Sequence, residues 1–264
     1  MRHIPKKKFG QNFLKDASII HSIIQSINPL PDDTLIEIGP GLGALTKPLL
    51  EKCAHLLAIE LDRDIVSWME NEYPKKSITI FNEDVLNFNF HQFHQKVRIV
   101  GNLPYNISTP ILFKCIENIQ IVKDLHFMLQ KEVVDRMIAI PSSSEYGRLS
   151  VMLQYYFSME HLVQVPKEAF EPEPKVESSF VRLIPYEQYP FIANNINQFG
   201  KIVKEAFSQR RKTIRNTLKS FINENDFEKI GINPQLRAEN LSVSDFVHIS
   251  NYLDEFIQTN CYVK

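Results

Sequence analysis

The sequence contains few cysteines and no long apolar run, and each absence excludes a class of protein. Its three cysteines, Cys53, Cys115 and Cys261, lie far apart and form no CxxC pair. They indicate neither a disulfide framework nor a zinc site, and they suit a reducing compartment. No segment approaches the roughly 18 consecutive apolar residues of a membrane span, and no apolar signal-peptide core follows the basic N-terminus. We therefore expect a cytoplasmic protein with no membrane segment and no metal.

Neither sign of charge is in excess, because the net charge of the 264 residues is -1. The content of 44% hydrophobic and 23% charged residues is that of an ordinary globular protein. The basic residues are nevertheless concentrated in two places. Residues 1–8 hold four basic residues and no acid, and residues 201–219 hold seven basic residues and one acid, a net charge of +6. Such segments indicate a polyanionic partner, and a solvated helix face is the alternative.

Short apolar segments alternate with helical patterns over the first half of the chain. Strands are expected at Thr34–Ile38, Leu56–Glu60, Ile78–Phe81, Val97–Val100 and Leu125–Leu129. Helices are expected over Asp16–Ile27, over Arg63–Glu72 with Asp62 as its N-cap, and over Thr109–Ile116 with Ser108 as its N-cap. Pro48 falls within the first crossover helix, so this helix begins later than Gly43 or is kinked. The alternation predicts an α/β fold, an open sheet with helices on both faces.

The character of the chain changes after Tyr186, where glycines, prolines and β-branched runs become scarcer. Amphipathic helices are expected over Phe199–Phe221, Asp226–Ile230 and Ser242–Ile257. We therefore predict two domains, an α/β domain over residues 1–188 and a small all-helical domain over residues 189–264.

The chain has only eight glycines, yet Gly39, Gly41 and Gly43 follow one predicted strand within five residues. Glycines let the backbone turn sharply and approach a ligand closely, and a helix N-terminus behind them favours a polar or anionic group. Ligands of open α/β sheets bind at this edge. The loop therefore predicts a nucleoside cofactor. Because the spacing from Gly39 to Ala44 also fits the dinucleotide fingerprint, the loop alone leaves NAD and S-adenosyl-L-methionine (SAM) both open.

Three acidic residues lie at the same predicted sheet edge. Glu60 ends the second strand, where a carboxylate can accept hydrogen bonds from a ribose diol, and Asp84 follows the third strand, within reach of an adenine amino group. If the cofactor is SAM, Glu37 lies near its ammonium group.

The fourth strand leads into Asn102-Leu103-Pro104-Tyr105. An exocyclic amine of a base is a poor nucleophile, because its lone pair is delocalised into the ring. If the Asn102 side-chain oxygen and the Leu103 carbonyl accept its N–H bonds, the lone pair can point at an electrophile. Tyr105 can stack on the base. This motif favours methyl transfer over hydride transfer. Further along, Phe170 lies in a proline-rich segment predicted to be an exposed loop, where its ring either joins the core or stacks on a ligand.

Together these features resemble the ribosomal RNA adenine N6,N6-dimethyltransferase family, in particular its bacterial small-subunit members. The resemblance covers essentially the whole chain and is carried by Lys7–Leu14, Glu37–Gly43, Glu60, Glu83-Asp84, Asn102–Tyr105 and Phe170. It implies a Rossmann-like SAM-dependent methyltransferase domain followed by a small helical domain. It implies that Tyr105 and Phe170 sandwich the target base. The implied cofactor contacts are Asn12, Leu14, Gly39, Gly41, Glu60, Asp84 and Asn102.

The resemblance also implies a substrate, two adjacent adenosines in a hairpin near the 3′ end of small-subunit rRNA, each methylated twice with S-adenosyl-L-homocysteine (SAH) as the other product. RNA phosphates are expected to contact Lys6, Lys7, Lys8 and, on one helix face, Arg210, Arg211, Lys212 and Arg215. A monomer is expected. The alternatives are a dimethyltransferase for large-subunit rRNA, an assembly factor that acts mainly by binding, and an NAD-dependent oxidoreductase.

Overall fold

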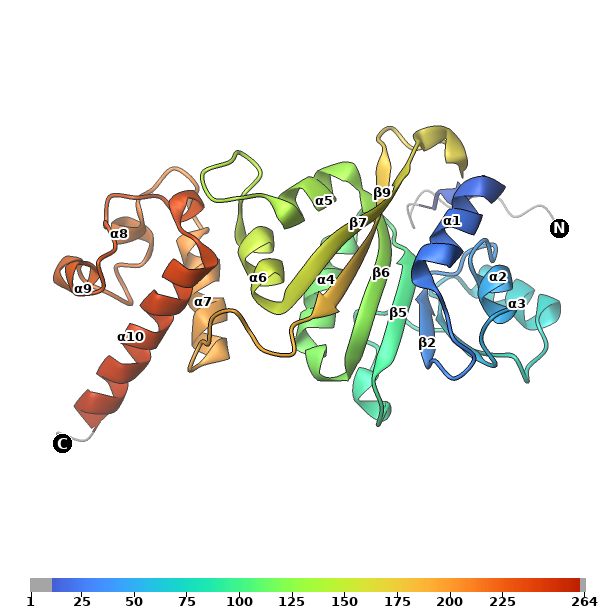
Figure 1. Ribbon diagram of the computed structural model, residues 1–264, viewed down its shortest axis with the longest axis horizontal. Helices are drawn as coiled ribbons and strands as arrows, with labels where there is room; N and C mark the ends of the chain where they lie inside the picture. The colour runs from blue at the N-terminus through green and yellow to red at the C-terminus, as the bar shows by residue number, and fades with distance from the viewer. Residues whose placement is uncertain (1–10, 262–264) are drawn as a thin grey trace. The chain divides into compact units, whose positions relative to one another are not determined.

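The computed structural model describes the backbone of residues 11–261 and the side chains of residues 11–255. It divides into two compact units (Figure 1). The first contains the chain up to Val134 together with Ser158–Pro185, and the second contains Asp135–Phe157 and the chain from Tyr186 onward. The junction at Tyr186 lies close to the predicted boundary between residues 188 and 189. The segment Asp135–Phe157, which the sequence groups with the first domain, belongs to the second unit.

The first unit is built on a seven-stranded sheet. Its strand order is β4 (Ile78–Phe81), β3 (Leu56–Ile59), β2 (Leu35–Ile38), β5 (Val97–Asn102), β6 (Val122–Gln130), β9 (Ser178–Pro185) and β7 (Phe157–Val165). The first five strands of this order are parallel, and β9 is antiparallel to β6. All five predicted strands are therefore confirmed, whereas β7 and β9 were not predicted. A second, two-stranded antiparallel sheet joins β1 (Phe13–Leu14) to β8 (Phe170–Glu171).

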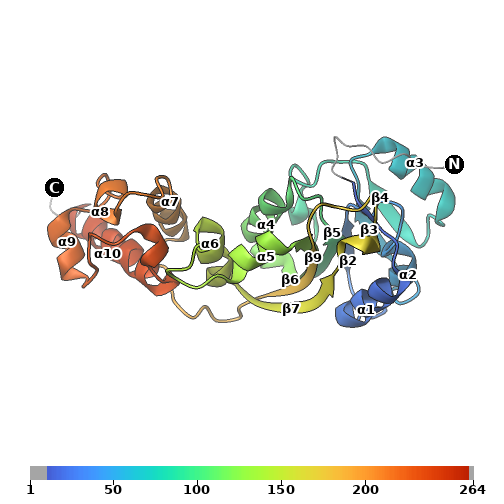
Figure 2. The same cartoon turned by 90° about the horizontal axis from the view of Figure 1, so that it is seen from above.

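Helices flank this sheet, and α1 and α4 lie on its opposite faces (Figure 2). The helices of the first unit are α1 (Ala17–Ile27), α2 (Thr46–Leu50), α3 (Arg63–Glu72) and α4 (Ser108–Glu117), with 3-10 turns η2 (Phe90–Gln92), η3 (Ile119–Ile121) and η4 (Lys167–Ala169). Helix α5 (Lys131–Ile138) crosses into the second unit. The second unit contains α6 (Arg148–Tyr156), α7 (Ile196–Ala206), α8 (Ile214–Thr217), α9 (Glu224–Lys229), η5 (Ala238–Asn240) and α10 (Val243–Cys261).

The helix ends follow local capping chemistry. The Asp16 carboxylate accepts hydrogen bonds from the backbone at the start of α1, and Asp62 does the same for α3. The predicted cap of α4 is wrong by one residue: Ile107 is the N-cap, and Ser108 is the first helical residue, with its Oγ donating to the Tyr105 carbonyl at 3.2 Å. Helix α2 begins only at Thr46, which places Pro48 in the first turn, where a missing N–H is tolerated.

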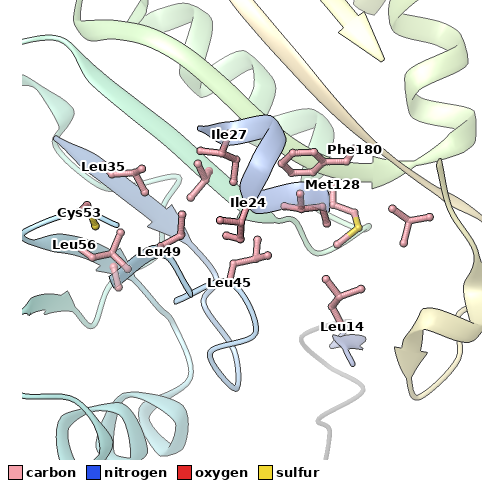
Figure 3. Packing of buried hydrophobic residues seen from close by; sticks show 14 of the residues in the cluster. Leu14, Ile24, Ile27, Leu35, Leu45, Leu49, Cys53, Leu56, Met128 and Phe180 are labelled. Carbon is pink, nitrogen blue, oxygen red and sulfur yellow. The ribbon is translucent and has the colours of Figure 1, made fainter. Parts of the chain in front are cut away.

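Buried aliphatic side chains join α1 to the sheet and to β1. In Figure 3, Ile24 and Ile27 of α1 pack among Leu35, Met128 and other residues of the cluster. Ile27 and Leu35 are almost completely buried. The cluster extends to Leu14 in β1, so the core continues up to the segment that enters the first strand.

A buried arginine holds the carboxyl end of α1 against the sheet. Arg98, in β5, is 7% exposed, and its guanidinium donates to the carbonyl of Ile27 at 2.6 Å and to that of Asn28 at 3.2 Å. It also forms ion pairs with Asp33 at 2.7 Å and with Asp124 at 3.0 Å. A cation at the end of a helix interacts favourably with the helix dipole, so Arg98 satisfies terminal carbonyls and balances two buried carboxylates.

The expected single helix over Phe199–Phe221 is wrong. Helix α7 ends at Ala206, and the chain turns before α8 begins at Ile214. Thr213 forms a β-bridge with Arg237, and the Ile214 amide donates to the Leu236 carbonyl at 2.8 Å. The backbone at Thr213 and Ile214 thus bonds to the segment Leu236-Arg237 instead of continuing the hydrogen bonds of α7. Within the described part of the chain, no helix combines the length and apolarity needed to cross a membrane.

Candidate functional site

A cavity of about 1180 Å³ opens in the first unit at the carboxyl ends of the parallel strands. Its walls come from the segments that follow β2, β3, β4 and β5, together with β1 and Glu171-Pro172. This is the edge at which open α/β sheets bind ligands. The predicted site residues that line the cavity are Asn12, Leu14, Gly39, Gly41, Glu60, Asp84, Asn102, Leu103 and Tyr105.

The loop after β2 has the backbone conformation that its glycines allow. The φ angles of Gly39, Gly41 and Gly43 are +64°, +55° and +77°, in the left-handed region that residues with a side chain rarely adopt. At Gly41 space is short as well, since a Cβ would lie 3.1 Å from the Phe13 ring. The glycines therefore let the loop lie close against β1.

Glu37 is a buried carboxyl group in the cavity wall. Its side chain is 2% exposed, and its Oε2 accepts a hydrogen bond from Thr46 Oγ1 at 2.6 Å. Burial raises the pKa of Glu37 to about 7; the hydrogen bond from Thr46 opposes this rise, and the charge of Glu60 adds to it. A carboxyl group in this state gains from a cationic ligand group, which would favour its ionised form.

Backbone amides hold two further carboxylates of the cavity wall, those of Glu60 and Asp84. Glu60 Oε1 accepts from the Asp62 amide at 2.8 Å, and Asp84 Oδ1 accepts from the Leu86 amide at 2.9 Å. Burial raises the pKa of Glu60, while hydrogen bonds from the amides of Asp62 and Gly41 lower it. Both carboxylates are thus fixed at the ends of neighbouring strands, in the order that the sequence predicts for ribose and adenine recognition.

Asn102 lies at the end of β5, and its amide group has a defined orientation. Its Nδ2 donates to the backbone carbonyl of Asn12 at 3.0 Å. Because Nδ2 makes this contact, the acceptor oxygen Oδ1 is on the other side of the amide. The backbone of Leu103 is fixed in turn by a hydrogen bond from its amide to the Met128 carbonyl at 3.2 Å. The two proposed acceptors are therefore adjacent on a rigid turn.

Tyr105 is half-buried in the cavity wall. Its hydroxyl forms a 2.7 Å hydrogen bond with Ser178 Oγ at the start of β9. Burial raises the pKa of Tyr105, and the bond with Ser178 opposes this rise. The ring is therefore held by its polar end, with the cavity beside it.

Phe170 does not line the cavity. Its ring is 1% exposed and belongs to the buried cluster, and its backbone pairs with Leu14 in the β1–β8 sheet. The surrounding segment is exposed as predicted, from Pro166 to Glu168 and again from Glu171 to Glu173. The structure thus places Tyr105, but not Phe170, at the cavity.

Two residues that flank β1, Gln11 and Lys15, make side-chain contacts that the sequence motifs do not reveal. Gln11 Nε2 donates to Asp62 Oδ2 at 3.3 Å, and Lys15 forms a 2.8 Å ion pair with Glu171. Glu171 and Pro172 themselves line the cavity. These pairs are separated by 51 and 156 residues in the sequence, so no local pattern could identify them.

The predicted RNA-binding residues fall into two groups. Lys6, Lys7 and Lys8 lie outside the described residues. Arg210, Arg211, Lys212 and Arg215 are all exposed in the second unit. The prediction that they share one helix face is wrong, because residues 207–212 form turns and only Arg215 is helical. Arg210 donates to the Ser144 carbonyl at 2.7 Å, and Arg215 pairs with Glu224 at 3.2 Å.

Sequence comparison decides the family. The profile described as ribosomal RNA adenine dimethylase matches residues 2–255. The chain belongs to the ribosomal RNA adenine dimethylase family. This membership confirms the predicted enzyme, a SAM-dependent rRNA methyltransferase, and it is incompatible with the NAD-dependent oxidoreductase that the glycine spacing leaves open.

Relatives of this dimethylase cover almost its full length. A protein from Methylobacillus flagellatus is 57% identical over 253 residues, 96% of this chain and 99% of the relative. One from Chromobacterium violaceum is 52% identical over 255 residues, 96% of this chain and 97% of the relative. Each is named ribosomal RNA small subunit methyltransferase A.

Solved structures agree on the fold of the dimethylase. A dimethyladenosine transferase from Plasmodium falciparum is similar with a TM-score of 0.77 and 25% identity, covering 94% of this chain and 98% of that one. The 23S rRNA methyltransferase ErmE is similar in fold, with a TM-score of 0.69 and 23% identity over 92% of this chain and 100% of that one. The predicted α/β methyltransferase fold is thus confirmed.

Proposed function

We propose that this dimethylase transfers methyl groups from SAM to N6 of two adjacent adenosines in a hairpin near the 3′ end of small-subunit (16S) rRNA during ribosome biogenesis. Each adenosine receives two methyl groups. The small-subunit names of relatives that are more than half identical support this choice of substrate. The observation that carries the chemistry is the oriented Asn102 amide beside Leu103 and Tyr105 at the cavity.

The residues that line the cavity suit the chemical groups of SAM. Gly39 and Gly41 both adopt positive φ, and at Gly41 a Cβ would also meet the Phe13 ring. Glu60 and Asp84, which accept hydrogen bonds from backbone amides, would also accept from a ribose and an adenine amino group, and Glu37 would accept from an ammonium group. Asn12, Leu14 and Asn102 complete the proposed contacts.

When bound, SAM supplies an activated methyl group on a sulfonium centre with a good leaving group. The protein therefore has to position the adenine amine for in-line attack, and no strong general base is required. Asn102 Oδ1 and the Leu103 carbonyl accept the two N–H bonds of that amine and direct its lone pair away from the ring. Tyr105 stacks on the base that has left the helix, a contact worth roughly 1–3 kcal/mol.

A base-stacking role for Phe170 requires a rearrangement, because its ring is 1% exposed. The β1–β8 pairing that covers it consists of two residues in each strand. We propose that Phe170 turns toward Tyr105 only when the target base enters, which separates this residue from those already at the cavity.

We also propose that the exposed Arg210, Arg211, Lys212 and Arg215 contact rRNA phosphates, together with Lys6, Lys7 and Lys8. Phosphate contacts position an RNA without reading its sequence. The helical segment 189–264 would thus bind rRNA, and residues 1–188 would bind SAM and catalyse the reaction. The protein would act as a monomer in the cytoplasm, on small subunits that are still maturing, without a metal.

The test is methyl transfer from labelled SAM to small ribosomal subunits that lack the dimethyladenosines, analysed by nucleoside mass spectrometry. We expect dimethyladenosine with the wild type and a loss of about 100-fold with Asn102→Ala. Asn71→Ala is a matched control, because Asn71 is exposed on α3 and does not line the cavity. Product on large-subunit RNA alone would replace the proposed substrate, and binding without any product would indicate an assembly factor.

A further inference from the structure

Tyr73, which belongs to none of the sequence motifs, lies next to the loop Gly39–Gly43 (the glycine loop) on the side away from the cavity. Residues on both sides of Gly43, including Leu42 and Ala44, line the cavity, whereas Gly43 does not. A methyl group placed on Gly43 would overlap the Tyr73 hydroxyl and would lie 3.4 Å from Tyr73 Cζ. The Tyr73 hydroxyl therefore contacts the loop backbone from behind.

Tyr73 is itself held firmly where α3 ends. Its amide donates to the Met69 carbonyl at 2.9 Å, and Met69 is completely buried. Its ring meets Trp68 edge to face, with centroids 6.0 Å apart and an interplanar angle of 84°. Trp68 also comes within 3.5 Å of the same position on Gly43. Two aromatic side chains, Trp68 in α3 and Tyr73 at its C-cap, thus lie behind the loop.

The electrostatic surroundings keep this hydroxyl in its neutral form. Burial raises the pKa of Tyr73 to about 12, and the charges of Glu37 and Glu72 contribute to the rise. Tyr73 thus interacts electrostatically with Glu37 in the cavity wall, in addition to its contact with the loop.

We propose that Tyr73 is a positioning residue for SAM, whose hydroxyl packs against Gly43 and holds the glycine loop in its binding conformation. Glycine loses more conformational freedom on ordering than any other residue. A loop with three glycines at positive φ therefore needs contacts outside the cavity to offset that loss, and Tyr73 provides one. The proposal rests on the proposed function only in the identity of the ligand.

The first test is calorimetric titration of Tyr73→Phe with SAH, without RNA. The phenyl ring remains, so we expect a folded protein whose Kd for SAH is about fivefold higher, because the loop loses the packing contact of the hydroxyl with Gly43. The turnover rate at saturating SAM should stay unchanged while KM for SAM rises. Tyr156→Phe is the matched control, because it removes a buried hydroxyl in the second unit. An unchanged Kd in Tyr73→Phe would overturn the proposal.

The second test is a double-mutant cycle with Gly43→Ala. The backbone strain at φ +77° is the same in both backgrounds, but the overlap exists only while the Tyr73 hydroxyl is present. We therefore expect Gly43→Ala to weaken SAH binding less in Tyr73→Phe than in the wild type; additive effects would contradict the contact. If Gly43→Ala does not fold, the single variant still decides. Because SAH binding needs no RNA, an inactive enzyme on rRNA would count against the proposed function alone.

Discussion

The side chain of Asn102 is oriented by the backbone of Asn12, through a 3.0 Å hydrogen bond between residues 90 positions apart. Asparagine suits this position because one amide group holds both a donor and an acceptor. The Nδ2 donor binds the carbonyl of Asn12, just before β1, and the Oδ1 acceptor is proposed to bind the substrate. The backbone of Asn12 therefore determines the orientation of the proposed catalytic amide of Asn102.

Asn102→Asp tests this relationship with almost no change in shape. An ionised carboxylate cannot donate to the Asn12 carbonyl, so one of its oxygens would face another acceptor. We expect the single-turnover rate of methyl transfer to fall by about 100-fold. Asn71→Asp, which makes the same change on the exposed face of α3, should keep its rate. Full activity in Asn102→Asp would show that this hydrogen bond does not orient the catalytic group.

SAM binding should depend on pH through Glu37. The pKa of Glu37 is about 7 in the ligand-free protein, so about half of the molecules carry a neutral carboxyl at that pH. An ammonium group favours the ionised form. We therefore expect SAM affinity to fall as the pH drops below 7, and proton release on binding near pH 7. Calorimetry in buffers of different ionisation enthalpy measures that release.

Glu37→Gln should remove both effects, with weaker but pH-independent binding. It should also stabilise the ligand-free protein at neutral pH. The folded-state pKa of Glu37 lies above its ordinary value of 4.5, so the folded state binds more protons between those values and stability decreases as pH rises through that window. Proton release that persists in Glu37→Gln would assign the titration to another group.

Acid should weaken the network around Arg98. Burial alone would raise the pKa values of Asp33 and Asp124, but hydrogen bonds and ion pairs hold both below their ordinary value of 3.8. Their contribution to the free energy of unfolding is thus complete above that value and is lost as pH falls through the lower folded-state values. Chemical denaturation over a pH series from about 5 down to about 2, which brackets the fall through these lowered pKa values, measures the loss.

Arg98→Met should cost about 3–5 kcal/mol in the free energy of unfolding, because it leaves buried carboxylates without their partner. Arg182→Met is a suitable comparison, since the side chains of the Arg182–Glu160 ion pair are 35% and 55% exposed and solvent-accessible pairs contribute about 0–1 kcal/mol. Equal losses in the two variants would mean that the Arg98 network adds little to stability.

Removing the exposed cations of the turn after α7 should weaken RNA binding without changing SAM binding. For Arg211→Ala with Lys212→Ala we expect the slope of log K against log salt to decrease by about one per lost phosphate contact. Filter binding over a salt series measures this slope. Lys75→Ala with Lys76→Ala, two exposed residues of the first unit, is the control pair. An unchanged slope would place the RNA elsewhere.

Local patterns predicted the elements that position the site. The parallel strands and α3 were predictable because each buries a short apolar segment next to a recognisable cap or turn. The strand order brought Glu60, Asp84 and Asn102 to one edge, as parallel strands require. Family resemblance added Asn12 and Leu14, which no periodicity reveals.

Long-range pairing was beyond prediction. The sequence leaves Phe170 open between the core and a ligand-stacking position, and only the structure, in which Phe170 pairs with Leu14 and is buried, places its ring in the core. Similarly, the turn at Arg210 replaces a helix because Thr213 bonds to Arg237, a partner that the local sequence does not specify. The support of Gly43 by Tyr73 depends on where α3 ends in space, so it too is visible only in three dimensions.

Helix α1 connects the buried Arg98 network to the segment that lines the cavity. Arg98 donates hydrogen bonds to carbonyls at the carboxyl end of α1. Asp16, at the other end, directly follows residues 11–15, which line the cavity. Eleven helical residues span about 16 Å. The helix therefore separates by a fixed length the Arg98 network, near the start of β5, from the segment that lines the cavity.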